Sequence, residues 1–204
     1  GEGVAYLLRK HKVARFQGRG RLLARDRVEV RAADGAFEVQ ASKAVVIASG
    51  SEAATLPDLP IDERRIVTSA GALSLTAAPR HLAVIGGGYV ALEQAQLFAR
   101  LGSTVTVLVR STLASKEEPE VGMALLEVFA DDGIRVVRRA TVSEVEQADD
   151  QVTVTATITG GTQQFRAAKV LVATGRRPNT DGLNLEAVQV KTGENNEVVV
   201  SHGL

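Results

Sequence analysis

Apolar runs and helical patterns alternate through the middle of the chain. Residues 81–86 (HLAVIG) and 104–109 (TVTVLV) are short apolar runs, typical of strands buried on both faces of a parallel sheet. A helical pattern follows each run, near 88–101 and near 118–132, and these patterns end at Gly102 and Gly133. Glycine tolerates the positive φ with which many helices end. The pattern predicts an α/β fold with a parallel sheet.

A second pattern occurs twice, in residues 13–51 and 134–176. Each copy opens with a short β-type run, continues with alternating segments, and closes with an apolar run, AVVIASG at 44–50 or VLVATG at 170–175. Glycines at 35 and at 160–161 mark hairpin turns. Each copy therefore predicts a three-stranded β-meander followed by a core strand.

The two copies differ in what precedes them. The strand–helix–strand–helix unit stands before the second copy, whereas residues 1–12 (GEGVAYLLRKHK) before the first indicate only the end of a helix. We therefore expect one complete domain and an incomplete second copy of it, derived from a parent with two nucleotide-binding domains.

The segment GGGYVA, residues 86–91, joins the first strand to the first helix. Gly86, Gly88 and Ala91 fit the pattern G-x-G-x-x-G/A, in which the glycines allow a tight turn and a close approach to a pyrophosphate. The small third residue lets the helix lie close to the strand. Free N–H groups and the helix dipole attract phosphates to such a helix start. The turn predicts a Rossmann-type dinucleotide site that also includes Gly87, Tyr89 and Val90.

The end of the second strand, VRSTLASK at 109–116, bears on the choice of nucleotide. An NAD site places Asp or Glu here, about twenty residues past the glycines, to accept from the ribose 2′-OH. This chain has Val109, followed by Arg110 and then Lys116. A guanidinium can bind a 2′-phosphate through two hydrogen bonds, and an ammonium adds a point charge.

This pattern favours NADP(H), with NAD(H) as the second choice. Ser111 and Thr112 could add hydroxyl donors, although a plain turn explains them equally well. The alternative for the two cations is ordinary surface charge, since Glu117 and Glu118 could pair with the lysine.

Composition narrows the class of function. Of the 204 residues 45% are hydrophobic, enough for a buried core, and the formal net charge is zero, which gives no pull toward nucleic acid or a membrane. With no cysteine, these residues offer no disulfide, thiolate or Cys-type zinc chemistry, and the three histidines form no ligand motif. We expect no metal site. No apolar run approaches the ~20 residues of a membrane span, and no signal peptide opens the chain, so we expect a cytoplasmic protein.

Three stretches resemble the pyridine nucleotide–disulfide oxidoreductases. They are VVIASGSEAATLPDLPIDERRIVTSAGAL at 45–73, VIGGGYVALEQAQLFARLGSTVTVL at 84–108 and VLVATGRRPNTDGLNLEAVQV at 170–190. Residues 3–75 look most like the dihydrolipoamide dehydrogenase branch, and residues 94–200 look more like the mercuric reductase branch. Two departures are IASGS for the usual IATGS at 47–51 and Gln94 at a position that is usually apolar.

The resemblance implies a chain of domains in the parent: an FAD domain, a central NAD(P) domain, a return to the FAD domain and a dimerisation domain. Residues 1–76 would be half of the FAD domain, 77–190 the NAD(P)-binding domain, and 191–204 the start of the return. The FAD glycine motif, the redox-active cysteine pair and the catalytic His–Glu pair would then lie in other parts of the parent. We expect no catalytic residue in this chain and no activity from it alone.

The resemblance also implies roles for individual residues. Tyr89 matches the tyrosine that covers the flavin until nicotinamide displaces it, and Glu93 matches a glutamate that pairs with a lysine near the flavin. Their plain alternatives are a partly buried aromatic at a helix start and an acid favoured there by the helix dipole. The family's ATGRxPN turn, which closes the nicotinamide domain near the flavin, is matched by Ala173, Thr174, Gly175, Arg176, Arg177, Pro178 and Asn179.

The sequence thus predicts the NADP(H)-binding central domain of an FAD-dependent disulfide or mercuric ion reductase. In the parent, hydride would pass from NADPH to flavin, and the partners would be the nicotinamide dinucleotide and the missing FAD and dimerisation domains. Two alternatives stay open. One is a nucleotide-binding or structural module without chemistry of its own, and the other is a fragment of an NADH-dependent dihydrolipoamide dehydrogenase.

Overall fold

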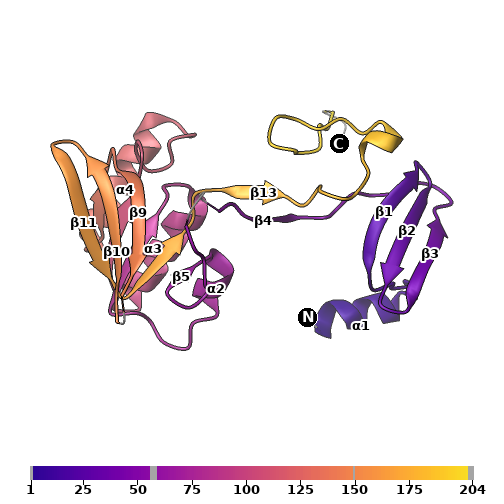
Figure 1. Ribbon diagram of the computed structural model, residues 1–204, viewed down its shortest axis with the longest axis horizontal. Helices are drawn as coiled ribbons and strands as arrows, with labels where there is room; N and C mark the ends of the chain where they lie inside the picture. The colour runs from indigo at the N-terminus through magenta and orange to yellow at the C-terminus, as the bar shows by residue number, and fades with distance from the viewer. Residues whose placement is uncertain (1, 56–58, 149, 202–204) are drawn as a thin grey trace. The chain divides into compact units, whose positions relative to one another are not determined.

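The computed structural model describes residues 2–55, 59–148 and 150–201, which form two compact units (Figure 1). Unit 1 consists of Gly1–Glu52 and Arg177–Leu204, and unit 2 consists of Ala53–Arg176. These units are defined by compactness, not by the domains of the parent fold. The expected domain limits, after residues 76 and 190, stay predictions.

A five-stranded parallel sheet forms the middle of unit 2. Its order is β5 (Ile66–Val67), β12 (Lys169–Val172), β6 (His81–Ile85), β7 (Thr104–Leu108) and β8 (Arg135–Val137). All four neighbouring pairs are parallel. The α/β fold class is confirmed, and the two apolar runs that predicted it are the adjacent strands β6 and β7.

Helices cover one face of this sheet. They are α2 (Ser69–Leu73), α3 (Tyr89–Arg100) and α4 (Pro119–Asp131). Ala91, Ala95 and Phe98 of α3 and Phe129 of α4 are buried in one hydrophobic cluster with residues of β6, β7 and β12. Because the two alanines are small, the start of α3 packs closely against the strands.

Both long helices end as their glycines predict. Gly102 has φ +94° and Gly133 has φ +71°. After α3, the N–H of Gly102 donates to Ala99 at 2.9 Å and that of Ser103 donates to Phe98 at 2.9 Å. This pair of bonds satisfies carbonyls that the helix leaves without partners, and it turns the chain into β7.

An antiparallel meander covers the other face of the sheet. Its strands are β9 (Thr141–Gln147), β10 (Val152–Ile158) and β11 (Gly161–Ala167), with β10 in the middle. Alternate residues of β10, namely Val152, Val154 and Ala156, are fully buried. They cluster with the residues of β6, β7 and β12 that face away from the helices. Unit 2 therefore has three layers: helices, parallel sheet and meander.

Unit 1 contains the meander of the first copy. Strands β1 (Arg19–Ala24), β2 (Arg27–Ala32) and β3 (Gly35–Gln40) pair in sequence order, and the turn before Gly35 is the predicted one. The buried core here is small, with Leu22 against Leu185 and Val188 next to the 3-10 helix η1 (Glu186–Val188). Helix α1 (Glu2–Lys10) has no buried residue among those described.

Two strand predictions in the first copy are wrong. The run that opens the copy at residue 13 forms no strand before Arg19, and the apolar run at 44–50 is not a strand, with Val46 84% exposed. Their counterparts in the second copy, β8 and β12, lie in the five-stranded parallel sheet. Within the described residues of unit 1 no parallel sheet is present to pair with the two runs, and a strand without neighbours has no partners for its backbone groups.

An acidic loop precedes β5. The Oδ1 of Asp62 accepts from the backbone N–H groups of Arg64, Arg65 and Ile66 at 2.9, 2.8 and 2.9 Å. Burial raises the pKa of Asp62, but the hydrogen bonds from these N–H groups outweigh it, so the pKa lies below its ordinary value of 3.8. The Glu63 carboxylate accepts from the Thr68 hydroxyl at 2.7 Å. The stretch PIDERRIVTS thus shapes the entry to β5 and α2.

Candidate nucleotide-binding site

Three of the predicted segments meet at the carboxyl edge of the parallel sheet in unit 2. Residues 86–88 follow β6, residues 109–111 follow β7, and residues 173–175 follow β12. The chain runs from β6 outward to β7 and β8, while β12 lies on the opposite side of β6, so the direction of winding reverses between β6 and β12. In open α/β sheets ligands bind at this reversal, outside the carboxyl ends of the strands.

Gly86 has the conformation and surroundings of an obligatory glycine. Its φ is +132°, and a Cβ atom there would overlap the carbonyl group of Ala173 at the end of β12. Its own N–H donates to the carbonyl of Leu108 at 3.0 Å. The turn therefore lies directly between the ends of β7 and β12, where only a residue without a side chain fits.

Gly87 is enclosed on the other side. A Cβ atom there would lie 2.8 Å from Cγ1 of Val109 and 3.1 Å from the carbonyl oxygen of Thr112. Its carbonyl accepts from the N–H of Ala114 at 2.8 Å. These contacts attach the loop after β7 to the glycine turn.

Gly88 faces open space. It is the N-cap of α3, with no side-chain hydrogen bond to the helix, and a Cβ atom there would meet nothing within 4 Å. The first N–H groups of a helix have no partner inside it. Donors and empty space in front of α3 are what a pyrophosphate requires, so the turn fits the predicted dinucleotide.

The residues that begin α3 differ in exposure. Ala91 is fully buried and Val90 is half-buried. Tyr89 is 68% exposed, and Glu93, one turn further along, is exposed as well. Both side chains are therefore accessible from solvent in this chain. Their roles beside a flavin stay predictions.

Gln94 is the departure from the family pattern, and it is buried at 7% exposure. Its Nε2 donates to the carbonyl of Ser69, the first residue of α2, at 3.2 Å. Its Oε1 has no hydrogen-bond partner among the described residues. The amide connects two helices, but one buried oxygen has no bond to compensate for its lost hydration.

The end of β7 separates into a buried and an exposed part. Val109 is only 2% exposed, whereas Arg110 and Ser111 are exposed and line a cavity of about 830 Å³. Lys116 lies on a turn after this segment and does not line the cavity. In the described part of the chain it forms no ion pair with Glu117 or Glu118. The structure thus brings together Arg110 and Ser111, but not Lys116.

The segment after β12 leads to strand β13 (Arg176–Pro178), which pairs with β4 (Ser51–Ala53). Ala173 is 9% exposed, Thr174, Gly175 and Arg176 are exposed, and the carbonyl of Gly175 accepts from the N–H of Ala54 at 3.0 Å. Ala173 and Thr174 border the glycine turn. Whether these residues contact a cofactor stays a prediction.

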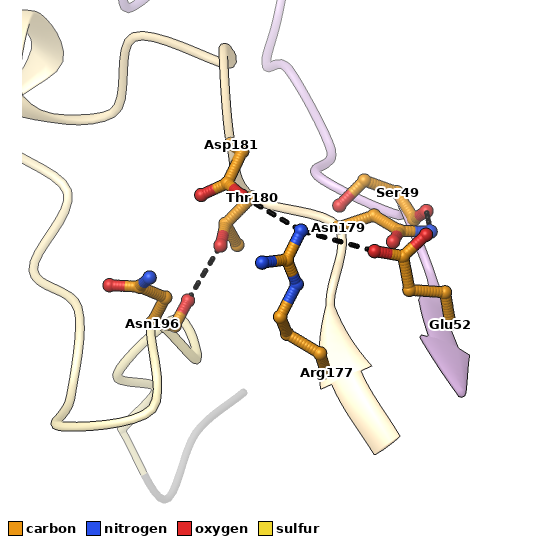
Figure 2. A network of polar contacts seen from close by, with 7 residues as sticks. All are labelled: Ser49, Glu52, Arg177, Asn179, Thr180, Asp181 and Asn196. Atoms are coloured by element: carbon orange, nitrogen blue, oxygen red, sulfur yellow. Dashed lines mark hydrogen bonds and ion pairs between the residues drawn. The ribbon is translucent and has the colours of Figure 1, made fainter. Parts of the chain in front are cut away.

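A polar network holds the rest of the turn in unit 1 (Figure 2). The Arg177 guanidinium lies 3.1 Å from both Glu52 and Asp181. The amide of Asn179 donates to the carbonyl of Ser49 at 3.2 Å. The backbone N–H of Asn179 donates to Gly50 at 3.0 Å. The GRRPN sequence therefore stabilises the exit from β13, which the motif alone did not reveal.

The cavity beside Arg110 contains residues that the sequence interpretation missed. Arg135, Arg138 and Arg139 also line it. They stand in the run RVVRR, which the sequence predicts only as part of the β-type run that opens the second copy. The side-chain pattern of this run does not by itself show that it lies beside the end of β7.

The sequence profile described as "Pyridine nucleotide-disulphide oxidoreductase" matches residues 1–204. The chain belongs to this family. It is 47% identical over 178 residues to a mercuric reductase of Streptomyces lividans, covering 87% of this chain and 37% of that protein. It is 41% identical over 194 residues to dihydrolipoyl dehydrogenase 3 of Pseudomonas putida, covering 94% of this chain and 42% of that protein.

Solved structures agree with this assignment. LpdA from Mycobacterium tuberculosis matches with a TM-score of 0.85 and 32% identity over 98% of this chain and 44% of that one. The HOCl-induced flavoprotein disulfide reductase RclA from Escherichia coli matches with a TM-score of 0.78 and 26% identity, over 98% of this chain and 46% of that one. The chain thus spans about two fifths of the length of its relatives.

Two further findings concern the residues that the structure describes. Among them, no helix has the length and apolar character needed to cross a membrane. Nor do they contain a group of three or more His, Cys, Asp or Glu side chains arranged to hold a metal ion.

Proposed function

We propose that unit 2 binds NADP(H) and that, in the parent enzyme, this nucleotide reduces an enzyme-bound FAD. The family is one of pyridine nucleotide oxidoreductases, and RclA, a structural relative, is a flavoprotein disulfide reductase. The finer statement, NADP(H) rather than NAD(H), depends on residues of this chain.

The glycine turn would hold the pyrophosphate. Gly88 leaves open space in front of α3, and the N–H groups of Tyr89, Val90 and Ala91 lie at the start of that helix. The nicotinamide supplies a hydride when the nucleotide is bound, and the task of this domain is to orient it. Thr174 to Arg176, after β12, lie on the side of the turn opposite β7 and would border the nicotinamide half.

The end of β7 supports NADP(H). Val109 occupies the position of the acid that accepts from a ribose 2′-OH, and its side chain lies against Gly87 of the turn. The structure thus has an apolar group where an NAD site has a carboxylate. Arg110, the next residue, is exposed in a cavity of about 830 Å³, where its guanidinium can form charge-assisted hydrogen bonds to a phosphate. This pairing is the observation on which the preference rests.

Titration calorimetry of NADPH and NADH against the 204-residue chain tests the proposal. One or two charge-assisted hydrogen bonds, at roughly 1.5–3 kcal/mol each, predict a preference for NADPH on the order of 10- to 1,000-fold. A Val109→Glu, Arg110→Met variant should lose it, whereas Arg80→Gln, which replaces an exposed arginine outside the cavity lining, should keep it. Because Val109 is buried, circular dichroism is needed to check that each variant is folded.

Equal affinities of the unmodified chain for NADPH and NADH would contradict the preference and favour an NADH-dependent dehydrogenase. Absence of binding to either nucleotide would favour a structural module. As part of the same proposal, the electron acceptor of the parent is a disulfide or a mercuric ion. The relatives that support it are a mercuric reductase and a dihydrolipoyl dehydrogenase. With no cysteine in these 204 residues, any thiolate chemistry takes place elsewhere in the parent.

A further inference from the structure

The cavity beside Arg110 carries more positive charge than the motif at the end of β7 accounts for. Its volume is about 830 Å³ and all of its lining lies in unit 2. Four arginines line it: Arg110, Arg135, Arg138 and Arg139. No aspartate or glutamate is among the lining residues.

Backbone hydrogen bonds hold Arg138 and Arg139 beside Arg110. Val109 donates its N–H to the carbonyl of Val137 at 3.0 Å, and its own carbonyl accepts from the N–H of Ala140 at 2.9 Å. Arg138 and Arg139 are the two residues between these anchors. The loop that they form is therefore closed at both ends on Val109, the residue that directly precedes Arg110.

Arg139 is held in an uncommon conformation. Its φ is +55°, in the left-handed region that few residues other than glycine adopt, and Asn and Asp adopt it more readily than arginine. The neighbouring Ala140 is buried in the core under the meander. The loop is thus a tight and anchored turn whose two exposed side chains are both cationic.

The charges of this cavity are not neutralised by the protein. Within the described ranges, none of the four arginines forms an ion pair. Arg135 lies over the ring of Phe165, 5.5 Å from its centroid, so this guanidinium has an aromatic partner. The three others have none, and like charges close together repel one another, so an anion of more than one charge would be favoured there. A guanidinium is suited to phosphate because it donates through a planar fork.

We propose that Arg138 and Arg139 form the second side of the site for the ribose 2′-phosphate, opposite Arg110, and so determine the specificity for NADP(H). This inference rests on the proposed function of the domain. A phosphate monoester carries a charge between −1.5 and −2 near neutral pH and has three acceptor oxygens, according to the general chemistry of phosphate esters. The Arg110 guanidinium alone leaves part of the phosphate's charge and some of its acceptor oxygens without a partner. The guanidinium groups of Arg138 and Arg139, on an anchored loop, can bind these remaining oxygens.

The test titrates three fragments of the nucleotide type into the 204-residue chain: adenosine 2′,5′-bisphosphate, its 3′,5′-bisphosphate isomer and adenosine 5′-monophosphate. The variants are Arg110→Gln, Arg138→Gln with Arg139→Asn, and the matched control Arg80→Gln with Arg166→Gln. Both control arginines are exposed, lie in unit 2 and are outside the cavity lining. Asparagine at 139 keeps a residue that tolerates the positive φ.

We expect the Arg138, Arg139 double variant to bind the 2′,5′-bisphosphate at least tenfold more weakly and the monophosphate within twofold of the unmodified chain. The control should change neither value by more than twofold. Unaltered thermal unfolding of the double variant shows that the loop is still formed.

The outcomes separate the two proposals. If the unmodified chain does not prefer the 2′,5′-bisphosphate, the NADP(H) preference itself fails. If the preference exists, is lost in Arg110→Gln and persists in the double variant, the NADP(H) assignment stands and the role of Arg138 and Arg139 is overturned. Equal losses for the 3′,5′-bisphosphate isomer would also overturn it, because the loop would then attract anions without recognising the 2′ position.

Discussion

Gly86 and Ala173 approach so closely that no side chain fits between them: a Cβ atom on Gly86 would overlap the Ala173 carbonyl. The two residues directly follow β6 and β12, which are neighbouring parallel strands. The glycine turn is therefore packed against the end of a strand from a distant part of the sequence. Gly86 and Gly88, the two glycines of the G-x-G pattern, consequently have different physical roles.

Substitution by alanine at Gly86 and Gly88 should separate these roles. Gly86→Ala introduces a clash and a strained φ of +132°, so we expect it to lower the free energy of unfolding by about 2–4 kcal/mol. Gly88→Ala meets open space at φ −83° and should cost less than about 1 kcal/mol. Its methyl group would occupy the room that we propose for the pyrophosphate, so NADPH affinity should still fall at least about tenfold. Denaturant unfolding measures the free energy of unfolding, and titration calorimetry measures the NADPH affinity. A stable Gly86→Ala chain would show that the turn can relax.

At position 94, an apolar residue should lower the stability of the chain less than an acidic residue does. Gln94→Leu loses the 3.2 Å hydrogen bond to Ser69 but also removes a buried oxygen without a partner. These effects oppose each other, so the free energy of unfolding should change by less than about 1 kcal/mol. Gln94→Glu places a charge at the same buried position and should cost more than about 2 kcal/mol at pH 7. Equal stability of the two variants in urea unfolding would contradict this account.

Asp62 should make stability depend on pH in the acidic range. Its folded pKa lies below the ordinary 3.8, because three backbone N–H groups stabilise the carboxylate against the opposing effect of burial. The folded state thus binds its proton less readily than the unfolded state, so the contribution is fully present above about pH 5 and is lost as pH falls through the folded pKa. Thermal unfolding between pH 7 and pH 3 should show a smaller loss for Asp62→Asn than for the unmodified chain.

A matched control for this experiment is Glu144→Gln, which replaces an exposed carboxylate on β9. It should follow the pH dependence of the unmodified chain. If Asp62→Asn does the same, the three hydrogen bonds to Asp62 do not contribute to acid sensitivity.

Residues 13–48 should exchange their amide hydrogens faster than residues 82–109. Among its described residues, unit 1 has only four buried apolar side chains, Leu22, Val30, Leu185 and Val188, and the run at 44–50 is not part of a sheet. Strands β6 and β7, in contrast, are buried between helices and a meander. Protection follows the free energy of local opening, which rises with buried apolar contact. Native-state exchange followed by mass spectrometry measures it, and equal protection in a monomer at low concentration would refute the prediction.

The sequence by itself determined the parts of this protein that depend on neighbouring residues. The glycine turn, the helix ends at Gly102 and Gly133 and the strands β6 and β7 follow from local conformation and from periodicity, and the structure confirms them. The sequence also shows that Val109 stands where an NAD site has an acid and that Arg110 follows it, because these residues come directly after one strand.

Only the tertiary structure decided the rest. The run at 44–50 is as apolar as β12, yet it is no strand, because backbone pairing depends on partners that the pattern of one segment cannot supply. Arg138 and Arg139 come beside Arg110 through two hydrogen bonds of the Val109 backbone. Such bonds use N–H and C=O groups that every residue other than proline has. For this physical reason the side-chain pattern of residues 135–139 does not by itself show that their loop lies beside the end of β7.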